Sequence, residues 1–245
     1  MRPFPRRIPR RLPRHDPRQL PRRLVRLYAG LLLYGASAAL LLRAGLGLDP
    51  WDVFHQGVSE HTAISIGMVS IITGALVLLL WIPLRERPGL GTVSNVVLVG
   101  LSMDATLALV PTPGGLAARI PLMLFAVLLN GLATGLYISA AFGSGPRDGL
   151  MIGLSRRTGR SIRLVRTSIE LVVLLTGILL GGTAGVGTVV YALAIGPLAQ
   201  YFLRVLTIPD ASAGMDFEVR RQRGILRPWS RRMDRDREPS SMDAG

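Results

Sequence analysis

The apolar residues of this chain fall in six long runs instead of the alternating pattern of a soluble domain. The runs cover approximately 24–43, 66–84, 92–110, 120–142, 162–181 and 187–206. About 20 consecutive apolar residues match the hydrocarbon thickness of a bilayer. The pattern therefore predicts an all-α integral membrane protein with six transmembrane helices.

Composition agrees with this prediction and narrows the class of protein. Hydrophobic residues make up 49% of the 245 positions, and the mean hydropathy is +0.40. All 29 basic residues are arginine, which gives a net charge of +14, and the absence of cysteine excludes disulfides and Cys-ligated metal sites. Because the arginines stand in the tails and a few loops, they indicate membrane orientation and contact with anionic lipid, not with nucleic acid.

The two ends of the chain are polar and irregular. Residues 1–23 carry a proline every fourth residue from Pro5 to Pro21, each followed by arginine. Such a tail is expected to be extended and disordered, either as a lipid- or partner-binding arm or as a solvated tail that only enforces orientation. Residues 207–245 hold eight arginines and seven acids, and we predict a second disordered cytoplasmic tail.

The arginine distribution predicts how the chain crosses the membrane. Ten arginines stand at or before Arg26, two lie in 85–91, four lie between spans four and five, and eight lie in 207–245. The alternate loops, 49–65 and 182–186, have none, and 111–119 has only Arg119. Because arginine-rich segments stay in the cytoplasm, this pattern predicts six spans with both termini inside.

The chain contains an internal repeat. A shift of 96 residues aligns 23–110 with 119–206 without a gap, and 26 of these 88 positions are identical. Each repeat holds three predicted spans, an odd number, so the second repeat enters from the opposite side. The sequence thus predicts two inverted three-helix repeats, at 24–110 and 119–206, joined by a linker at 111–118. This architecture is common among secondary transporters.

Both repeats carry the motif G-x-x-P-x-D-x4-G-x-S-x-x-T-x-x-S-I, at 47–66 and 143–162. Its proline suits the first turn of a helix, and its aspartate, Asp52 or Asp148, is favoured there by the helix dipole. The motif predicts a helix of about ten residues, too short to cross the membrane, which is either re-entrant and part of a substrate path or an interfacial connector. Its other repeated residues are Gly47, Pro50, Gly57, Ser59, Thr62 and Ser65, and Gly143, Pro146, Gly153, Ser155, Thr158 and Ser161.

Polar residues inside the predicted spans complete the candidate site. A central charge in a membrane span is costly and is a functional hypothesis by default. The candidate substrate path comprises Asp52, Asp104, Asn130, Asp148, Arg166, Glu170 and Gln200. The alternatives are a hydrogen-bonding hub for Asp104, a helix-stapling ion pair for Arg166 and Glu170, and helix–helix contact for Asn130. The sequence shows no catalytic fingerprint and no metal-site spacing, so we predict no enzyme, cofactor or metal.

Four segments of the chain resemble a known family. They are D-P-W-D-V-F-H-Q-G (49–57), S-I-G-M-V-S (65–70), W-I-P-L-R-E-R-P-G-L-G-T (81–92) and G-P-R-D-G-L-M-I-G-L-S-R-R-T-G-R-S-I-R (145–163). They resemble the YczE/YyaS/YitT family of bacterial membrane proteins, in its YczE-like branch, over about 24–206. YitT-type members carry a soluble C-terminal domain, whereas the segment after 206 is short and polar.

The resemblance implies a bacterial cytoplasmic-membrane location and defines no activity. Transport of a small solute is the leading prediction, by analogy with the inverted-repeat architecture. The alternative is a non-transporting regulator or scaffold whose basic tails bind anionic lipid or a cytoplasmic partner.

Overall fold

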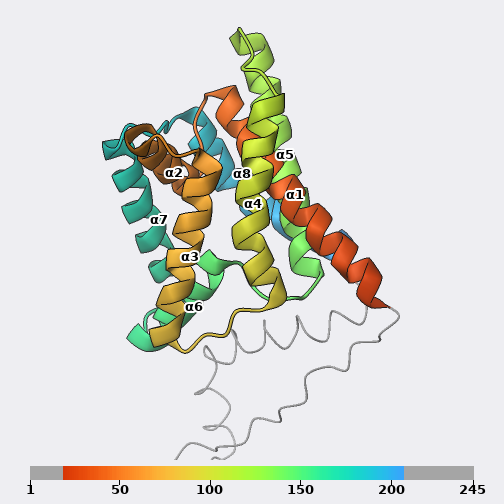
Figure 1. Ribbon diagram of the computed structural model, residues 1–245, viewed down its shortest axis with the longest axis vertical. Coiled ribbons are helices and arrows are strands. Elements are labelled where there is room, and N and C mark those ends of the chain that lie inside the picture. The colour runs from red at the N-terminus through yellow and green to blue at the C-terminus, as the bar shows by residue number, and fades with distance from the viewer. Residues whose placement is uncertain (1–18, 207–245) are drawn as a thin grey trace, which may run out of the picture. The chain divides into compact units, whose positions relative to one another are not determined.

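The computed structural model describes residues 19–206, and all regular structure in this range is helical (Figure 1). The predictions for residues 1–18 and 207–245 lie outside the described residues. The helices are α1 (Leu20–Ala44), α2 (Pro50–Thr62), α3 (Ile66–Leu84), α4 (Leu90–Leu109), α5 (Leu116–Ser139), α6 (Pro146–Thr158), α7 (Ile162–Leu179) and α8 (Val186–Leu206).

Five of the described helices, α1, α3, α4, α5 and α8, are long and apolar enough to cross a membrane. The sequence predicts a sixth span at 162–181, but α7 is not among the five. Within its 18 residues it contains Arg163, Arg166 and Glu170. The helices α2 and α6, with 13 residues each, are about 20 Å long and too short to cross. The all-helical membrane class is confirmed.

Helix α1 begins at Leu20, inside the segment for which the sequence predicts an extended tail. Pro21 lies in the first turn, where a missing N–H group costs nothing. About one turn of arginine-bearing helix therefore precedes the apolar run at 24–43. Arg23 is buried there, with 3% of its surface exposed. Its Nε and Nη2 atoms donate to the carbonyl oxygen of Ala140 at 3.0 and 2.8 Å, just beyond the end of α5.

Replacing Arg23 with glutamine should lower the free energy of unfolding by about 1–3 kcal/mol, because buried carbonyls at the end of α5 lose a charged donor. Arg22 is exposed on the same turn, so Arg22→Gln is the matched control and should be neutral. Thermal unfolding of the full chain in detergent micelles measures both. Equal effects of the two substitutions would contradict the assigned role of Arg23.

The repeated glycines of the motif turn the chain from a long helix into a short one. Gly47 has φ +121° and Gly143 has φ +122°, a region that side chains other than hydrogen disfavour. A Cβ at Gly47 would lie 2.7 Å from the backbone N of Gly185, and one at Gly143 would lie 2.8 Å from Thr92 Oγ1. The positive φ and the lack of room for a Cβ therefore both require glycine at these two positions.

The helices of the two halves recur with the offset found in the sequence. The short helix Pro50–Thr62 shifted by 96 becomes Pro146–Thr158, and α1, α3 and α4 start 96 residues before α5, α7 and α8. The halves also make equivalent contacts with each other: Gly91 N donates to Phe142 O at 3.0 Å and Gly187 N donates to Leu46 O at 2.7 Å.

Each short helix packs against a long helix of the other half, α2 on α7 and α6 on α3. In Figure 1 the two short helices lie near opposite ends of α3. Their first turns are buried whereas their last turns, with Glu60 and Arg157, are exposed. Trp51 of α2 packs with Val77 of α3, and Leu150 of α6 packs against the same cluster. Both short helices therefore direct their N-terminal ends towards the middle of the long helices.

Candidate functional site

A charged cluster lies where the N-terminal ends of α2 and α6 approach each other. Arg147 is the second residue of α6, and its Nη1 lies 3.7 Å from Asp49 Oδ1 and its Nη2 3.9 Å from Asp52 Oδ1. The guanidinium also lies over the ring of Trp51, 4.8 Å from its centre, in a favourable cation–π arrangement. One half of the repeat thus supplies the cation and the other half supplies the two carboxylates and the aromatic ring.

The two carboxylates are buried and positioned by the first turn of α2. Asp49 is the N-cap, and its Oδ1 accepts the backbone N–H groups of Trp51 and Asp52 at 2.8 and 3.1 Å. Asp52 Oδ1 lies 3.1 Å from His55 Nδ1. Burial, together with the neighbouring Asp52, raises the pKa of Asp49 to about 7, against the opposing effect of Arg147. Burial lowers the pKa of His55 to about 3, so its imidazole is neutral.

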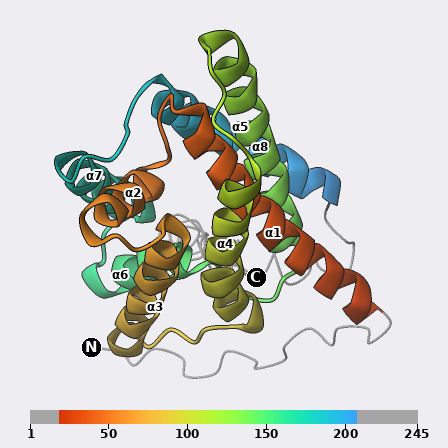
Figure 2. The same cartoon turned by 45° about the horizontal axis from the view of Figure 1, so that its top comes forward.

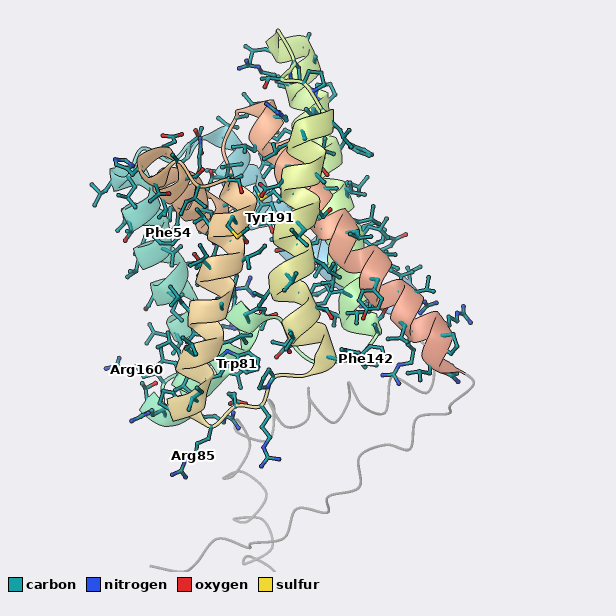
Figure 3. The ribbon with its side chains drawn as sticks, in the orientation of Figure 1. Phe54, Trp81, Arg85, Phe142, Arg160 and Tyr191 are labelled. Atoms are coloured by element: carbon teal, nitrogen blue, oxygen red, sulfur yellow. The ribbon has the colours of Figure 1, made fainter. Side chains whose placement is uncertain are left out.

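A hydrogen-bonded network joins the long helices beside this cluster. Tyr34 of α1 and Tyr191 of α8 share a hydrogen bond, and the Tyr191 hydroxyl donates to Asn130 Oδ1 at 3.1 Å. Asn130 Nδ2 in turn donates to Ser37 Oγ at 2.8 Å. Figure 3 shows Tyr191 in the interior of the helical bundle and Trp81 next to α6. The network holds α1, α5 and α8 together around the hydroxyl groups that face Arg147.

The second copy of the repeated aspartate directly follows Arg147 in the chain. Asp148 is hydrogen-bonded to the hydroxyl of Tyr137 and interacts electrostatically with Arg166 and Arg147. Arg166 pairs with Glu170 at 2.9 Å one turn along α7. These charges extend the cluster from the buried first turn of α6 to the exposed face of α7.

The structure brings together five of the predicted path residues and places the other two elsewhere. Asp52, Asn130, Asp148, Arg166 and Glu170 all belong to the arrangement around Arg147.

Asp104 instead caps the start of α3: its Oδ2 accepts from Ser65 Oγ at 2.5 Å and its Oδ1 from Gly67 N at 2.8 Å. This position corresponds to the hydrogen-bonding alternative for Asp104. Gln200 is exposed on α8.

The repeated serines and threonines of the motif satisfy backbone groups. Ser59 and Ser155 donate to carbonyl oxygens five residues on, at 2.6 and 2.7 Å. Ser65 and Ser161 cap the next helix, each accepting a backbone N–H at 3.3 Å. These residues therefore end the short helices and start the long ones, and they do not contact the charged cluster. Within residues 19–206, no group of three His, Asp or Glu side chains is arranged to hold a metal ion.

Sequence reasoning missed the residues at the centre of the cluster, Asp49 and Arg147. Arg147 is one of the four arginines between spans four and five whose number indicates the cytoplasmic side, but it stands in the first turn of α6, the end directed towards the middle of the long helices. A signal was present in the repeat itself. Trp51 and Arg147 occupy equivalent positions in the two repeats, each between a proline and an aspartate that both repeats share. A position that differs while its neighbours are identical can give each half a different chemical role.

A bundle of apolar helices around a buried charged cluster defines a polytopic membrane protein. The chain belongs to the family described as "Family of unknown function (DUF6198)", whose model matches residues 21–204. It is 30% identical over 202 residues to "Uncharacterized membrane protein YczE" of Bacillus subtilis, covering 82% of this chain and 92% of that one. The YczE-like resemblance predicted from the motifs is confirmed.

Two further relatives extend this picture. An "Uncharacterized protein" of Haemophilus influenzae is 40% identical over 176 residues, covering 72% of this chain and 81% of the relative. The "Uncharacterized protein YyaS" of Bacillus subtilis is 24% identical over 181 residues, covering 72% and 90%. No solved structure matches the chain.

Proposed function

We propose that this chain is a small-solute transporter of the bacterial cytoplasmic membrane, built from two inverted three-helix repeats with both termini in the cytoplasm. The arginine distribution, the offset of 96 residues between helix starts and the equivalent contacts between the halves support this topology. In this arrangement α7 is the sixth span. Its Arg166 and Glu170 neutralise each other, which lowers the cost of charge in a membrane.

The observation that carries the proposal is the unequal packing of two equivalent helix pairs. Helices α3 and α4 pack closely, and a Cβ at Gly100 would overlap the carbonyl oxygen of Gly67. The equivalent residues of α7 and α8 are Arg163 and Gly196. Among the described residues no atom lies within 4 Å of a Cβ at Gly196, and α7 diverges from α8 (Figure 2).

Unequal conformations of two related halves are the basis of alternating access. If the halves exchange conformations, α7 packs on α8 while α3 separates from α4, and the central cluster becomes accessible from the other side. The cluster around Arg147 lies between the two halves, where inverted-repeat transporters bind their solute. A regulator or scaffold has no need of a second conformation, so the existence of that conformation separates the two candidate functions.

Paired cysteines test for the second conformation, and the chain contains no native cysteine. Ser65 and Asp104 are in contact, so Ser65→Cys with Asp104→Cys should form a disulfide in the conformation described here. The equivalent pair, Ser161→Cys with Gln200→Cys, should form one only after α7 closes on α8. We expect both disulfides to form in native membranes and each to arrest solute uptake into proteoliposomes, assayed with a panel of small solutes.

Reduction of either disulfide should restore uptake, and each single cysteine serves as the control for its pair. In a variant carrying all four cysteines, the two disulfides should exclude each other within one molecule. Formation of the first disulfide alone, with no cross-link at the second pair under any condition, would favour the scaffold and refute the transporter.

A further inference from the structure

The guanidinium of Arg147 has donors that the protein leaves unused. It carries five N–H donors, yet its nearest carboxylate oxygens lie at 3.7 and 3.9 Å, beyond hydrogen-bonding distance. Its contacts within residues 19–206 are these two ion pairs and the ring of Trp51, without a side-chain hydrogen bond. The Arg147 side chain is 27% exposed, whereas those of Asp49 and Asp52 are 6% and 5% exposed. A planar guanidinium that is partly exposed and stacked on an aromatic ring is suited to bind an oxyanion through two hydrogen bonds.

The carboxylates beside Arg147 outnumber the cation they face. Asp49 and Asp52 share this one guanidinium, and His55 is neutral and leaves its Nε2 without a partner among the described residues. Two buried carboxylates with one cation retain a net negative charge, which favours uptake of a proton by one of them. Burial and Asp52 place the pKa of Asp49 at about 7, so that proton exchanges near neutral pH.

The ionisable groups that interact with Asp49 come from α1, α2, α6 and α8, and α3, Ile66–Leu84, has no titratable side chain. They are Tyr34 from α1, Asp52 and His55 from α2, Arg147 from α6 and Tyr191 from α8. Asp148 also interacts with Arg147, and it connects the cluster to Tyr137 of α5 and to Arg166 and Glu170 of α7. Burial raises the pKa of both carboxyl groups of the pair Asp49 and Asp52, and protonation of Asp49, whose pKa is about 7, reduces the negative charge that faces Arg147.

We infer that Arg147 binds the oxyanion, a carboxylate or phosphate group, of a small water-soluble solute, and that Asp49 takes up a proton as the solute binds. This inference rests on the proposed transport function and names the substrate class of the same site. While Asp49 is ionised, it and Asp52 compete with the solute for the guanidinium. When the proton occupies Asp49, only Asp52 remains charged, and the guanidinium is free to bind the oxyanion.

The coupling follows from charge balance and requires no covalent step. One proton and one negative charge enter the site together, so the charge of the buried cluster is the same before and after. Binding of each ligand strengthens binding of the other by the same factor. A solute that leaves takes its charge away, and the proton leaves Asp49 with it. Transport is then symport of a proton with an anion.

The test uses the full chain in detergent micelles at constant ionic strength, with sulfate and acetate as probes because neither changes its ionisation between about pH 6 and pH 8. Dissociation constants are measured by isothermal titration calorimetry. We expect sulfate or acetate to bind up to tenfold more tightly for each pH unit of acidification, the limit for one coupled proton. Choline, a cation, should not bind.

Asp49→Asn mimics the protonated carboxyl and still offers an oxygen to cap α2. This variant should bind sulfate and acetate tightly, with the same dissociation constants at about pH 6 and pH 8. Glu60→Gln, on the exposed end of α2, should keep the pH dependence of the unmodified chain. Failure of both probes to bind, or binding independent of pH in the unmodified chain, overturns the inference. Competition of sulfate with added phosphatidylglycerol would assign the site to a lipid headgroup and overturn the water-soluble solute.

These results are independent of the disulfide experiment. If both disulfides form and exclude each other but anion binding does not depend on pH, the proposed transport function stands and only the proposed substrate class is wrong. Proton-linked anion binding without a second conformation would show an anion site in a protein that does not transport.

Discussion

Replacing Arg147 with glutamine should abolish solute uptake and weaken anion binding by about 30-fold or more, because removing one partner of a buried charge interaction costs about 2–5 kcal/mol. Glutamine keeps hydrogen-bonding capacity but removes the charge that Asp49 and Asp52 face. Those two carboxylates are then left without a cation in a buried site, so their pKa values should rise further and the site should hold an additional proton. Dissociation constants and proteoliposome uptake measure these effects.

Two comparisons distinguish this role from a purely structural one. Arg147→Lys keeps the positive charge but loses the planar fork and its stacking on Trp51, so it should retain the pH dependence of binding at reduced affinity. Arg160→Gln, beyond the exposed end of α6 (Figure 3), is the matched control and should behave as the unmodified chain. Unimpaired uptake in Arg147→Gln, or an equal loss of uptake in Arg147→Gln and Arg160→Gln, would show that Arg147 is not part of the binding site.

Gly100→Leu should destabilise the conformation described here and lower the thermal unfolding midpoint, whereas Gly196→Leu at the equivalent position should leave the midpoint unchanged. A Cβ at Gly100 overlaps the carbonyl oxygen of Gly67, so a larger side chain must separate α3 from α4. Overpacking costs about 1–3 kcal/mol at ordinary core sites and more where backbone must move. A Cβ at Gly196 meets nothing within 4 Å among the described residues. Thermal unfolding midpoints in micelles measure the difference.

The same two variants also test alternating access. Because α8 must close on α7 during transport, Gly196→Leu should fold with normal stability and yet lose uptake. When combined with Ser161→Cys and Gln200→Cys, it should also prevent the disulfide between these two cysteines. Gly114→Ala, in the loop before α5 with open space around it, is the control for a harmless glycine substitution. Normal uptake in Gly196→Leu would show that α7 and α8 need not approach each other, and the proposed cycle would be wrong.

Several features of this protein were determined by the sequence alone. The apolar runs, the short helices with proline in their first turn, and the offset of 96 residues are local patterns, and the structure has helices at these places. Ser65 and Ser161 of the repeated motif cap their helices, because an N-cap depends on residues three positions apart. The family also followed from contiguous motifs, and the comparisons confirm it.

The tertiary structure decided which charges meet. Arg147 reaches Asp49 and Asp52 from positions 98 and 95 residues further along the chain, and no local pattern encodes a contact over that separation. The position of Asp104 within a span predicts a place in the substrate path, but close packing of Gly67 and Gly100 brings it to the backbone N–H of Gly67 in the first turn of α3.

The physical reason is that helix formation depends on neighbours a few residues apart, whereas the environment of a charge depends on every element packed around it. Helix α7 shows both. Its helical pattern is plain in the sequence, but the packing of Asp148 near Arg166 and the divergence of α7 from α8 depend on how the two halves pack together.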